Sequence, residues 1–321
     1  MGLRIAFLTK LASVEAYAPA SMGNVGIGFD IFGMAFQEPG DTVRVEYSDA
    51  SGVEIVAITG DGGRLPLAPD KNTASVAVAH YLRMIDSLQG VRLWVNKGLP
   101  LASGLGSSAA SAVAGVFAVN ALFGEPLERK ALLAACLEGE AIVSGYHADN
   151  VGPSLLGGIT LITGTAISDI RHLPVPSDLH CVLVTPHVAV ETAAARAVLP
   201  QNLPLDHIVR QTGQVARFVD ALYRDDLAAV VSAMEADLIA EPARAHLMPH
   251  LDEARRIAKR AGALGLVISG AGPTLCALCG GRAEADATRH ALDALYQESG
   301  IGATSRVTCV DREGARIIRS L

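Results

Sequence analysis

A run of small residues at 103–108, Ser-Gly-Leu-Gly-Ser-Ser, has the composition of a loop that binds phosphate. Alanine and valine follow it, so we expect the loop to open directly into a helix. The unpaired N–H groups and the positive dipole end at a helix start attract an anion, and glycine lets the backbone approach that anion closely. The alternative is a tight turn in which Ser107 caps the helix, and this stretch alone is compatible with both.

Two better-known phosphate loops fit this stretch poorly. A Walker loop requires a lysine after its second glycine, and none follows Gly106. The spacing Gly104-x-Gly106-x-x-Ala109 matches a dinucleotide-binding turn. However, Pro100 separates it from the apolar strand expected at 93–95, and no second strand ending in an acidic residue follows. We therefore expect a phosphate loop of another kind.

Two further segments concentrate polar side chains that could bind a small substrate. The first, at 16–35, is rich in glycine and is expected to form a loop that carries Asn24 and Asp30. Their amide and carboxylate groups could orient an amine or a hydroxyl, although Asn and Asp also commonly support turns. The second, at 144–154, places three polar residues between apolar flanks: His147, Asp149 and Asn150. A single histidine without a partner at metal-binding spacing is more typical of a structural role.

The composition of the whole chain restricts its class. With 321 residues, of which 50% are hydrophobic, it can bury a large core and has room for two domains. A net charge of −7 and only 4% aromatic residues argue against a nucleic-acid partner. The apolar run at 5–8 is too short for a signal peptide, and no run reaches membrane-spanning length. We therefore expect a soluble cytoplasmic protein that does not interact with membranes.

Apolar periodicity and turn residues divide the chain into the elements that must position these loops. In the first half we expect strands at 41–47 and 53–58 and helices at 73–86, 107–123 and from 126 to about 140. Serine, aspartate and proline at 166–178 mark a domain junction, which predicts domains at 12–166 and 167–321. The second half has expected strands at 181–184, 265–269, 274–278 and 304–310 and expected helices at 191–199, 206–223, 225–239, 251–262 and 283–297. This order predicts an α+β domain whose helices lie on one face of a mostly antiparallel sheet.

A third glycine loop, Ser-Gly-Ala-Gly-Pro-Thr at 269–274, lies between two of these expected strands. Cys276 and Cys279 follow it with the spacing of a redox or metal-binding pair. No second pair exists and the flanks indicate a buried strand, so we interpret both cysteines as core residues.

The three glycine loops, in this order and with these residues, resemble those of the GHMP small-molecule kinase superfamily. The resemblance extends from Ala16 to about Ala315 and rests on several motifs taken together. In this sequence they are Pro19-Ala-Ser-x-x-Asn24-x-Gly-x-Gly-Phe-Asp30, the loop at 103–108 with the two alanines after it, His147-x-Asp-Asn150-Val, Thr192-x-x-x-Arg196-x-x-x-Pro200, Glu241-Pro-x-Arg244 and Ser269-Gly-Ala-Gly-Pro-Thr274. The resemblance implies an α+β, two-domain fold: an N-terminal α/β domain with the phosphate loop and a ferredoxin-like C-terminal domain. Chains of this kind often form homodimers.

The resemblance also implies ATP as phosphoryl donor, Mg²⁺ as cofactor and a small-molecule acceptor that carries a hydroxyl. The implied nucleotide-binding residues are Asn72 and Lys97 beside the adenine and, around the phosphates, Pro100, Leu101, Ala102, Ser103, Gly104, Leu105, Gly106, Ser107 and Ser108. Ser108 and Glu140 would hold the metal. The chain is one residue shorter between Glu140 and His147 than common relatives, so Glu138 is the alternative carboxylate. The implied acceptor site consists of Asn24, Asp30, His147, Asn150, Arg196, Arg244 and Gly272, with Asn150, His147 and Glu140 as catalytic residues.

Within the superfamily, the motifs are most similar to those of members that phosphorylate homoserine. Arg196 and Arg244 would bind its carboxylate, and Asp30 its ammonium group. Mevalonate- and galactose-type relatives carry an aspartate base about where this chain has Asn150, which points away from those substrates. Phosphoryl transfer depends on positioning and charge neutralisation, which predicts a reaction without a carboxylate base. The alternatives are another GHMP kinase, for mevalonate or a sugar, and a ligand sensor on the same fold without catalysis.

Overall fold

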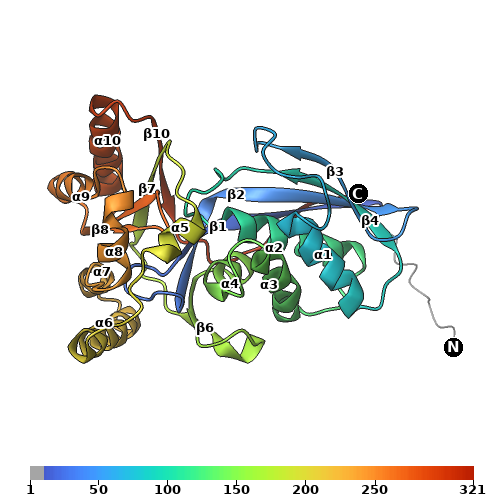
Figure 1. The fold of residues 1–321 in the computed structure, drawn as a ribbon, viewed down its shortest axis with the longest axis horizontal. Helices are drawn as coiled ribbons and strands as arrows, with labels where there is room; N and C mark the ends of the chain where they lie inside the picture. The colour runs from blue at the N-terminus through green and yellow to red at the C-terminus, as the bar shows by residue number, and fades with distance from the viewer. Residues whose placement is uncertain (1–10) are drawn as a thin grey trace, which may run out of the picture.

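A seven-stranded sheet forms one end of the molecule and a four-stranded sheet forms the other (Figure 1). The computed structural model describes residues 11–321, so the apolar run at 5–8 lies outside the described residues. Helices pack against both sheets, and the two sheets meet near the middle of the long axis (Figure 1). The expected α+β class is confirmed.

The first sheet has the strand order β11, β1, β2, β4, β3, with β5 and β6 added beside β2. Its strands are β1 (Ser13–Gly23), β2 (Phe32–Ser48), β3 (Val53–Thr59), β4 (Gly90–Asn96), β5 (Ile159–Ile162), β6 (Ile170–Leu173) and β11 (Arg316–Ser320). Only β3 and β4 pair in parallel among these described strands. The buried Val43 and Val45 alternate with more exposed residues in β2, and this alternation fixes its register because every second side chain enters the core.

Three α-helices pack on this sheet, α1 (Thr73–Met84), α2 (Ser107–Leu122) and α4 (Ala148–Leu156), and a fourth, α3 (Leu133–Ala141), packs on these helices (Figure 1). Helix α2 lies between the other three and also contacts β1 and β2. Its alanines and valines are buried on every side, because small side chains let neighbouring backbones approach closely. The tightly enclosed α2 therefore fixes the position of the loop at 103–108, which runs into its first turn.

The second sheet is fully antiparallel, in the order β10, β7, β9, β8. Its strands are β7 (His180–Pro186), β8 (Gly265–Ile268), β9 (Leu275–Cys279) and β10 (Ala303–Cys309). The helices around it are α5 (Thr192–Ala197), α6 (Leu205–Tyr223), α7 (Leu227–Met234), α8 (Ala240–Arg244), α9 (Leu251–Arg260) and α10 (Arg282–Glu298). Short 3₁₀ turns lie at Arg129–Leu132, Ile167–Asp169 and Ala245–Leu247.

Helices cover both faces of the second sheet, so the expectation of helices on one face is wrong. Along β9, Leu275 and Ala277 share a core with α9 and α10. Cys276 and Leu278 point to the opposite face and share a core with α7 and with the first sheet. Side chains alternate between the two faces of a strand, and every residue of β9 is apolar. Both faces of the sheet are therefore apolar there, and each needs its own cover.

Two expectations about element bounds are also wrong. The segment at 16–35 is not one loop, because β1 runs to Gly23 and β2 starts at Phe32, which leaves a turn at 24–31. The helix expected at 225–239 ends at Met234 as α7, and a separate helix, α8, starts at Ala240, where the Asp237 carboxylate accepts hydrogen bonds from the N–H groups of Ile239 and Glu241. Strands β6 and β11 follow residue 166 and yet join the first sheet. The domain division at 12–166 and 167–321 stays a prediction.

One apolar core continues from the first sheet to α6 and α7 beside the second. The rings of Phe32 in β2 and Phe218 in α6 lie 4.8 Å apart between centroids. All five cysteines are free, and Cys276 and Cys279 are buried in β9, which confirms them as core residues. Within residues 11–321, no helix has the length and apolar character needed to cross a membrane.

Candidate active site

A cavity of about 540 Å³ lies where loops of the first sheet meet those of the second. Its walls come from the loop at 103–108, the starts of α1 and α4, helix α5 and the glycine loop at 269–274. Most of the expected site residues line it: Asn24, Asn72, Lys97, Leu101, Ala102, Ser103, Gly104, Gly106, Ser107, Ser108, Glu140, His147, Asn150, Arg196 and Arg244. The fold therefore brings together segments that are far apart in the sequence.

The glycines of the phosphate loop are required by backbone geometry and by close packing. Gly104 and Gly106 have φ angles of 77° and 63°, which residues with a Cβ rarely adopt. A Cβ on Gly104 would lie 2.3 Å from the carbonyl oxygen of Ser269, and a Cβ on Gly106 would lie 2.3 Å from Ser21 Oγ. Gly106 is the N-cap of α2 and no side chain caps the helix, so the alternative with Ser107 as the cap is wrong.

Two neighbouring segments hold the phosphate loop from opposite sides. From the 269–274 loop, Ser269 Oγ donates a hydrogen bond of 2.8 Å to the Gly104 carbonyl, and the Thr274 N–H donates one of 3.2 Å to the Ser103 carbonyl. From β1, the Ser21 N–H donates one of 3.1 Å to the Leu105 carbonyl. The loop is therefore fixed before any ligand arrives.

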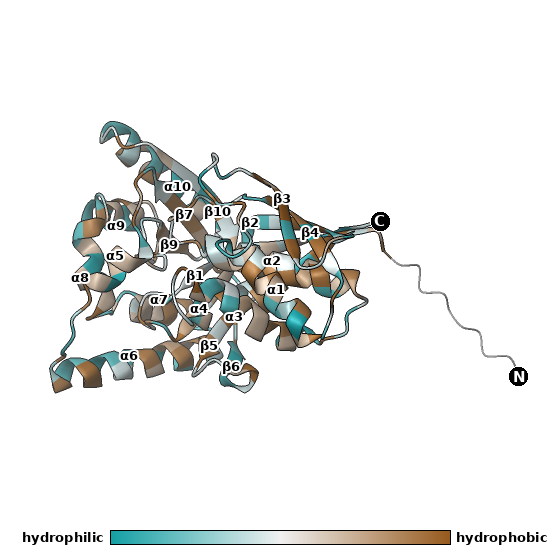
Figure 2. Ribbon diagram, turned by 45° about the vertical axis from the view of Figure 1, so that its right-hand side comes forward, coloured by the Kyte–Doolittle hydropathy of each residue, from teal (hydrophilic) through white to brown (hydrophobic). Residues whose placement is uncertain are grey.

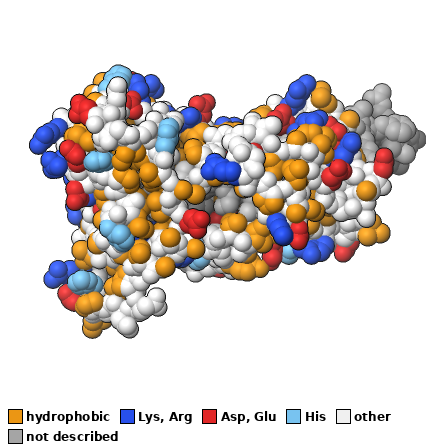
Figure 3. All heavy atoms as spheres, turned by 45° about the horizontal axis from the view of Figure 1, so that its top comes forward, with side chains coloured by type: hydrophobic (Ala, Val, Ile, Leu, Met, Phe, Trp, Pro, Cys, Tyr) orange, Lys and Arg blue, Asp and Glu red, His pale blue; other side chains and the backbone are white. Residues whose placement is uncertain are grey.

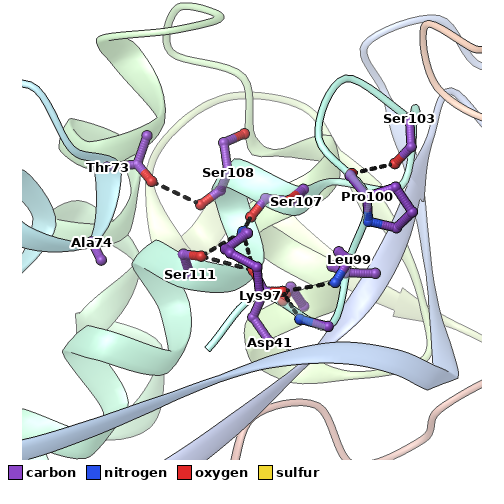
Figure 4. Close-up of polar contacts among 12 residues, drawn as sticks. Asp41, Thr73, Ala74, Lys97, Leu99, Pro100, Ser103, Ser107, Ser108 and Ser111 are labelled. Carbon is purple, nitrogen blue, oxygen red and sulfur yellow. Dashed lines mark hydrogen bonds and ion pairs between the residues drawn. The ribbon is translucent and has the colours of Figure 1, made fainter. Parts of the chain in front are cut away.

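A buried ion pair lies directly under the phosphate loop (Figure 4). Lys97 Nζ contacts Asp41 Oδ2 and donates a 2.7 Å hydrogen bond to the Ser107 carbonyl. It also donates at 2.7 Å to Ser111 Oγ, which itself donates to Asp41. The other oxygen of Asp41 accepts from the backbone N–H groups of residues 98–99. All three ammonium protons of Lys97 are engaged, so its ammonium group supports the first turn of α2, and its place beside the adenine stays a prediction.

We expect Lys97→Met to lower the free energy of unfolding by about 3–5 kcal/mol, because it leaves the buried Asp41 carboxylate without its cation. Lys130→Met, which removes an exposed lysine, should leave stability unchanged within error. Urea denaturation measures both variants. The double variant Asp41→Asn/Lys97→Met should recover part of the loss, since no buried charge remains. Equal stability of the two lysine variants would contradict a supporting role for the pair.

The carboxylate of Glu140 faces the first turn of α2. Ser108 Oγ donates a 3.1 Å hydrogen bond to Glu140 Oε1, and Ser144 Oγ donates to the same oxygen. Burial raises the pKa of Glu140, although the two serine hydrogen bonds and Lys97 act in the opposite direction. Glu138 instead accepts a hydrogen bond from the exposed Tyr146 hydroxyl. Of the two carboxylates considered from the sequence, only Glu140 lines the cavity.

Asp30 and Arg196 bind each other beside the cavity, with Arg196 on its wall. Two hydrogen bonds of 2.8 and 3.1 Å join the guanidinium to the carboxylate. His147 Nδ1 lies 3.5 Å from Asp30 Oδ2, and burial lowers the pKa of His147 despite that carboxylate. The sequence led us to expect that Asp30 and Arg196 bind opposite ends of an acceptor, whereas here they neutralise each other. Arg196 Nε stays without a hydrogen-bond partner.

Arg244 is anchored by the backbone. Its Nε donates a 3.0 Å hydrogen bond to the Ala195 carbonyl, and its Nη1 donates one of 3.1 Å to the Gly270 carbonyl. The side chain is buried, and burial lowers its pKa. Phe29 lies 5.4 Å from the guanidinium carbons of both Arg244 and Arg196, so one aromatic ring positions both cations.

Asn24 holds the turn at 24–31 with both ends of its amide. Nδ2 donates to the Gly270 carbonyl and Oδ1 accepts from the Asp30 N–H. It therefore supports the turn, which was the alternative to direct substrate binding. Four expected residues are not on the cavity wall: Pro100, Leu105, Asp30 and Gly272.

These four residues support the residues that line the cavity, through hydrogen bonds or packing. The Pro100 carbonyl accepts a hydrogen bond from Ser103 Oγ, and the Leu105 side chain is buried in the core. Asp30 reaches the cavity through Arg196. A Cβ on Gly272 would lie 2.3 Å from Met248 Sδ, so this glycine is needed for packing, and its neighbours at 270–271 form the wall.

The side chain of Asn150 is oriented by β1. Ser21 Oγ donates a 3.1 Å hydrogen bond to Asn150 Oδ1, so the amide is fixed with Nδ2 on the opposite side. A Cβ on Gly23 would lie 3.0 Å from Asn150 Nδ2 and 2.2 Å from Asp149 Oδ2. Gly23 therefore leaves room for an amide donor and a carboxylate acceptor side by side.

Asp149 is a cavity residue that the sequence analysis singled out but did not assign to the site. It is buried in the first turn of α4. Burial, together with the negative charges of Asp30 and Glu140, raises its pKa to about 7. Strongly raised carboxylate pKa values are typical of functional sites. The sequence signal was its place directly before Asn150.

Three unpaired buried atoms distinguish this cavity from ordinary packing. Among the described residues, four buried side-chain polar atoms lack a hydrogen-bond partner, and three of them, Ser107 Oγ, Glu140 Oε2 and Arg196 Nε, belong to residues that line the cavity. The fourth, Arg92 Nε, lies in β4. Because buried polar groups are nearly always paired, such atoms indicate places where ligand atoms bind.

On the face drawn in Figure 3, Lys and Arg side chains are interspersed with Asp and Glu.

A kinase of small molecules is the class that this fold and this phosphate loop define. The family model described as GHMP kinases N terminal domain matches residues 72–158, and the one described as GHMP kinases C terminal matches residues 218–298. The chain belongs to the GHMP kinase family, whose members use ATP.

The relatives within that family carry more specific names. The homoserine kinase of Chloroherpeton thalassium is 39% identical, over 96% of this chain and 100% of the relative. The crystal structure of homoserine kinase from Cytophaga hutchinsonii superposes with a TM-score of 0.93 at 41% identity, over 97% of this chain and 99% of that one. L. major mevalonate kinase, at 18% identity and a TM-score of 0.71 over 94% and 98% of the two chains, shares the fold alone.

Proposed function

We propose that the protein transfers the γ-phosphoryl group of ATP to the side-chain hydroxyl of L-homoserine and forms O-phospho-L-homoserine in threonine biosynthesis. The observation that carries the proposal is that three residues lining one cavity, Ser107, Glu140 and Arg196, each hold a buried polar atom without a hydrogen-bond partner. They match the three charges that the reaction must bind: a phosphate, a divalent cation and a carboxylate. The similarity to proteins named homoserine kinase over nearly the whole chain supports the choice of acceptor.

The nucleotide is proposed to lie along the wall that runs from α1 to α2. The N-terminal end of α2 and the backbone of residues 103–108 would hold the phosphates. Apolar side chains on the same wall offer a surface for the adenine: Leu65, Val95, Leu101 and Val143. Asn72 borders them and is held in place as the N-cap of α1, where its Oδ1 accepts from the Ala74 N–H.

The residues that line the cavity fit a Mg²⁺ ion that also binds the phosphates of the nucleotide. Within residues 11–321 no group of three or more His, Cys, Asp or Glu side chains could hold a metal. Mg²⁺ does not require one, because it keeps several waters and binds through one or two protein oxygens plus phosphates. The unpaired Glu140 Oε2 and the Ser108 hydroxyl provide those oxygens. When bound, the ion would neutralise charge on the phosphates.

The acceptor is proposed to lie between α4 and the two arginines. Arg196, through its unpaired Nε, and Arg244 would bind the carboxylate of homoserine. The ammonium group would lie toward Asp30 and His147. Asn150, held by Ser21, would donate from Nδ2 to the hydroxyl oxygen and keep it in line with the γ-phosphorus. In a loose transition state the hydroxyl proton would leave late, to the transferred phosphoryl group or to water, so no dedicated base is required.

We expect Arg244→Ala to lower kcat/KM for homoserine by roughly thirtyfold or more, since loss of one partner of a desolvated ion pair costs about 2–5 kcal/mol. The KM for ATP should change less than about twofold. Arg255→Ala is the matched control, because Arg255 is partly buried and bonds a backbone carbonyl and Glu241 away from the cavity. Steady-state kinetics with each substrate varied in turn gives both values. Equal effects on both substrates would assign Arg244 to the fold or to the nucleotide site.

A coupled ADP-release assay with Mg²⁺, ATP and a panel of homoserine, mevalonate and galactose tests the proposed function. We expect turnover with homoserine only. Turnover of mevalonate or galactose without homoserine would favour the other GHMP kinases. Binding of homoserine without ADP release would favour a ligand sensor. We further propose that the enzyme works in the cytoplasm and that its macromolecular partner is a second copy of itself.

A further inference from the structure

Lys71 is a cation on the cavity wall that belongs to none of the three glycine loops. It precedes Asn72, the N-cap of α1, and it is exposed. Its backbone N–H donates a 3.0 Å hydrogen bond to the Ala68 carbonyl, which holds the turn that leads into α1. Within residues 11–321, its ammonium group forms no hydrogen bond or ion pair. The backbone of Lys71 is therefore fixed, while its charge is available to a ligand.

The start of α1 lies beside the phosphate loop. Helices α1 and α2 pack side by side (Figure 2). Thr73 Oγ1 donates a 3.3 Å hydrogen bond to the Ser108 carbonyl in the first turn of α2 (Figure 4). Lys71 is two residues before Thr73, so the Cα atoms of the two residues lie within about 7 Å of each other. Lysine has a long, flexible stem, and its ammonium group can reach the space in front of that turn.

The phosphate loop itself contains no cation. A Walker loop includes a lysine that reaches the phosphates, and the run at 103–108 has none. P-loop NTPases and protein kinases both place a lysine at the phosphates in addition to the metal. Glu140, Asp149 and Glu191 line the cavity and add negative charge when they are ionised. A nucleotide bound here therefore requires a cation from another segment.

The other lysine and arginine side chains on the described wall are already engaged. They are Lys97, Arg196 and Arg244. The ammonium group of Lys97 is paired with Asp41, and the guanidinium of Arg196 is paired with Asp30. Arg244 donates to two backbone carbonyls and lies with Arg196 beside Phe29. Lys71 is the cation that this part of the chain leaves for the phosphates.

We propose that Lys71 is a nucleotide-binding residue whose ammonium group binds phosphate oxygens of ATP beside the first turn of α2. The proposal rests on the proposed function, because that function places the nucleotide along the wall from α1 to α2. The start of the neighbouring helix thus supplies the cation that a Walker loop carries within itself. The contact is made before and during phosphoryl transfer, so Lys71 should contribute to nucleotide affinity and leave kcat nearly unchanged.

Equilibrium dialysis with radiolabelled ADP and adenosine, in the presence of Mg²⁺ and without an acceptor, tests this proposal. We expect Lys71→Met to raise the Kd for ADP about tenfold and to leave the Kd for adenosine unchanged, because only ADP loses a charge-assisted hydrogen bond. Lys71→Arg should bind ADP within about threefold of wild type, since it keeps the charge. Lys130→Met is the matched control, because Lys130 is exposed and lies outside the cavity.

Two results of the dialysis experiment would overturn the proposal. If Lys71→Met binds ADP as tightly as Lys130→Met does, Lys71 is a solvated lysine. If ADP and adenosine lose affinity equally, Lys71 contacts the base or the ribose, or it supports the turn before α1. The Tm of Lys71→Met should equal that of wild type within error, because the side chain is exposed.

Salt dependence and steady-state kinetics give readouts that a structural role would not change. Salt screens an exposed ionic contact, so the affinity of wild type for ADP should fall more steeply with KCl than that of Lys71→Met. With homoserine as acceptor, Lys71→Met should raise the KM for ATP about tenfold and change kcat less than about twofold. Parallel salt dependence, or a fall in kcat with an unchanged KM for ATP, would contradict the proposal. Absence of homoserine turnover by wild type would instead refute the proposed function, and the dialysis result would still decide the role of Lys71.

Discussion

Glu140→Gln is expected to lower kcat by about a thousandfold or more and to raise the Mg²⁺ concentration needed for half-maximal rate. The substitution keeps an acceptor for the hydrogen bonds of Ser108 and Ser144 but removes the charge that faces the cavity. Interactions with a catalytic metal contribute several kcal/mol to transition-state stabilisation, and each 1.4 kcal/mol is about tenfold in rate. Initial rates across a Mg²⁺ titration at saturating ATP and homoserine measure both effects.

A stability measurement separates this loss from damage to the fold. Burial raises the folded-state pKa of Glu140, so its contribution to stability is greatest below the unfolded pKa and is lost as the pH rises. Glutamine avoids that cost, so the Tm of Glu140→Gln at pH 8 should equal or exceed that of wild type. Glu138→Gln is the control, because Glu138 bonds the exposed Tyr146 hydroxyl. A raised Mg²⁺ requirement in Glu138→Gln and not in Glu140→Gln would overturn the assignment.

The phosphate loop could be predicted from the sequence because its physical causes are local. Glycine at 104 and 106 permits left-handed backbone, and the alanines and valines after Ser108 favour a fully enclosed helix. Both signals lie within about twenty residues. The same holds for most strands of the second sheet, whose apolar runs are continuous because both faces are buried.

Strand β1 was missed because its strand character depends on distant partners. Ala16, Ala18 and Ala20 alternate with other residues, but small side chains and Pro19 give a weak period-two signal. The strand forms because it lies between β2 and β11, and the latter is nearly three hundred residues away. Local propensity carries no information about such pairing.

The partners within the site were also beyond the reach of the sequence. The resemblance implied a ligand-binding role for Asp30, Lys97 and Arg196, and it gave no partner for any of them within the protein. The structure pairs Asp30 with Arg196 across 166 positions of sequence and Lys97 with Asp41 across 56. Each pairing neutralises a charge that burial would otherwise make costly. The packing of β2, β4 and α5 decides which charges meet, and no rule of sequence spacing predicts it.

Asp149→Asn is expected to lower kcat by about a hundredfold, and to do so without loss of stability. The Asp149 carboxylate lies beside the Asn150 amide over Gly23, so its removal should disturb the orientation of the acceptor hydroxyl, and positioning alone can contribute that factor. The charged and titratable groups around it are Asp30, Glu140, His147, Arg196 and Arg244. Measurement of kcat at saturating substrates for Asp149→Asn and His147→Gln gives the comparison.

The pH dependence of stability gives the second readout. The folded pKa of Asp149 is raised to about 7 against an unfolded value of 3.8, so the folded state binds its proton more tightly. The stabilisation is complete below about pH 4 and is lost as the pH rises through 7. Asp149→Asn should therefore have a higher Tm than wild type at pH 8, and the difference should shrink toward pH 4. A Tm difference independent of pH would show that the carboxylate is not buried in its ionised form.

The size of the kinetic loss decides whether the reaction proceeds without a carboxylate base. Loss of orientation accounts for about a hundredfold, whereas loss of a general base in addition to its positioning exceeds about ten-thousandfold. A drop of that larger size in Asp149→Asn, with ATP binding intact, would identify Asp149 as the proton acceptor; the same drop in His147→Gln would identify the histidine. Burial lowers the pKa of His147, so its ring is neutral at pH 7 and could accept a proton. Losses near a hundredfold in both variants would leave Asn150, oriented by Ser21, as the group that holds the hydroxyl while its proton departs with the phosphoryl transfer.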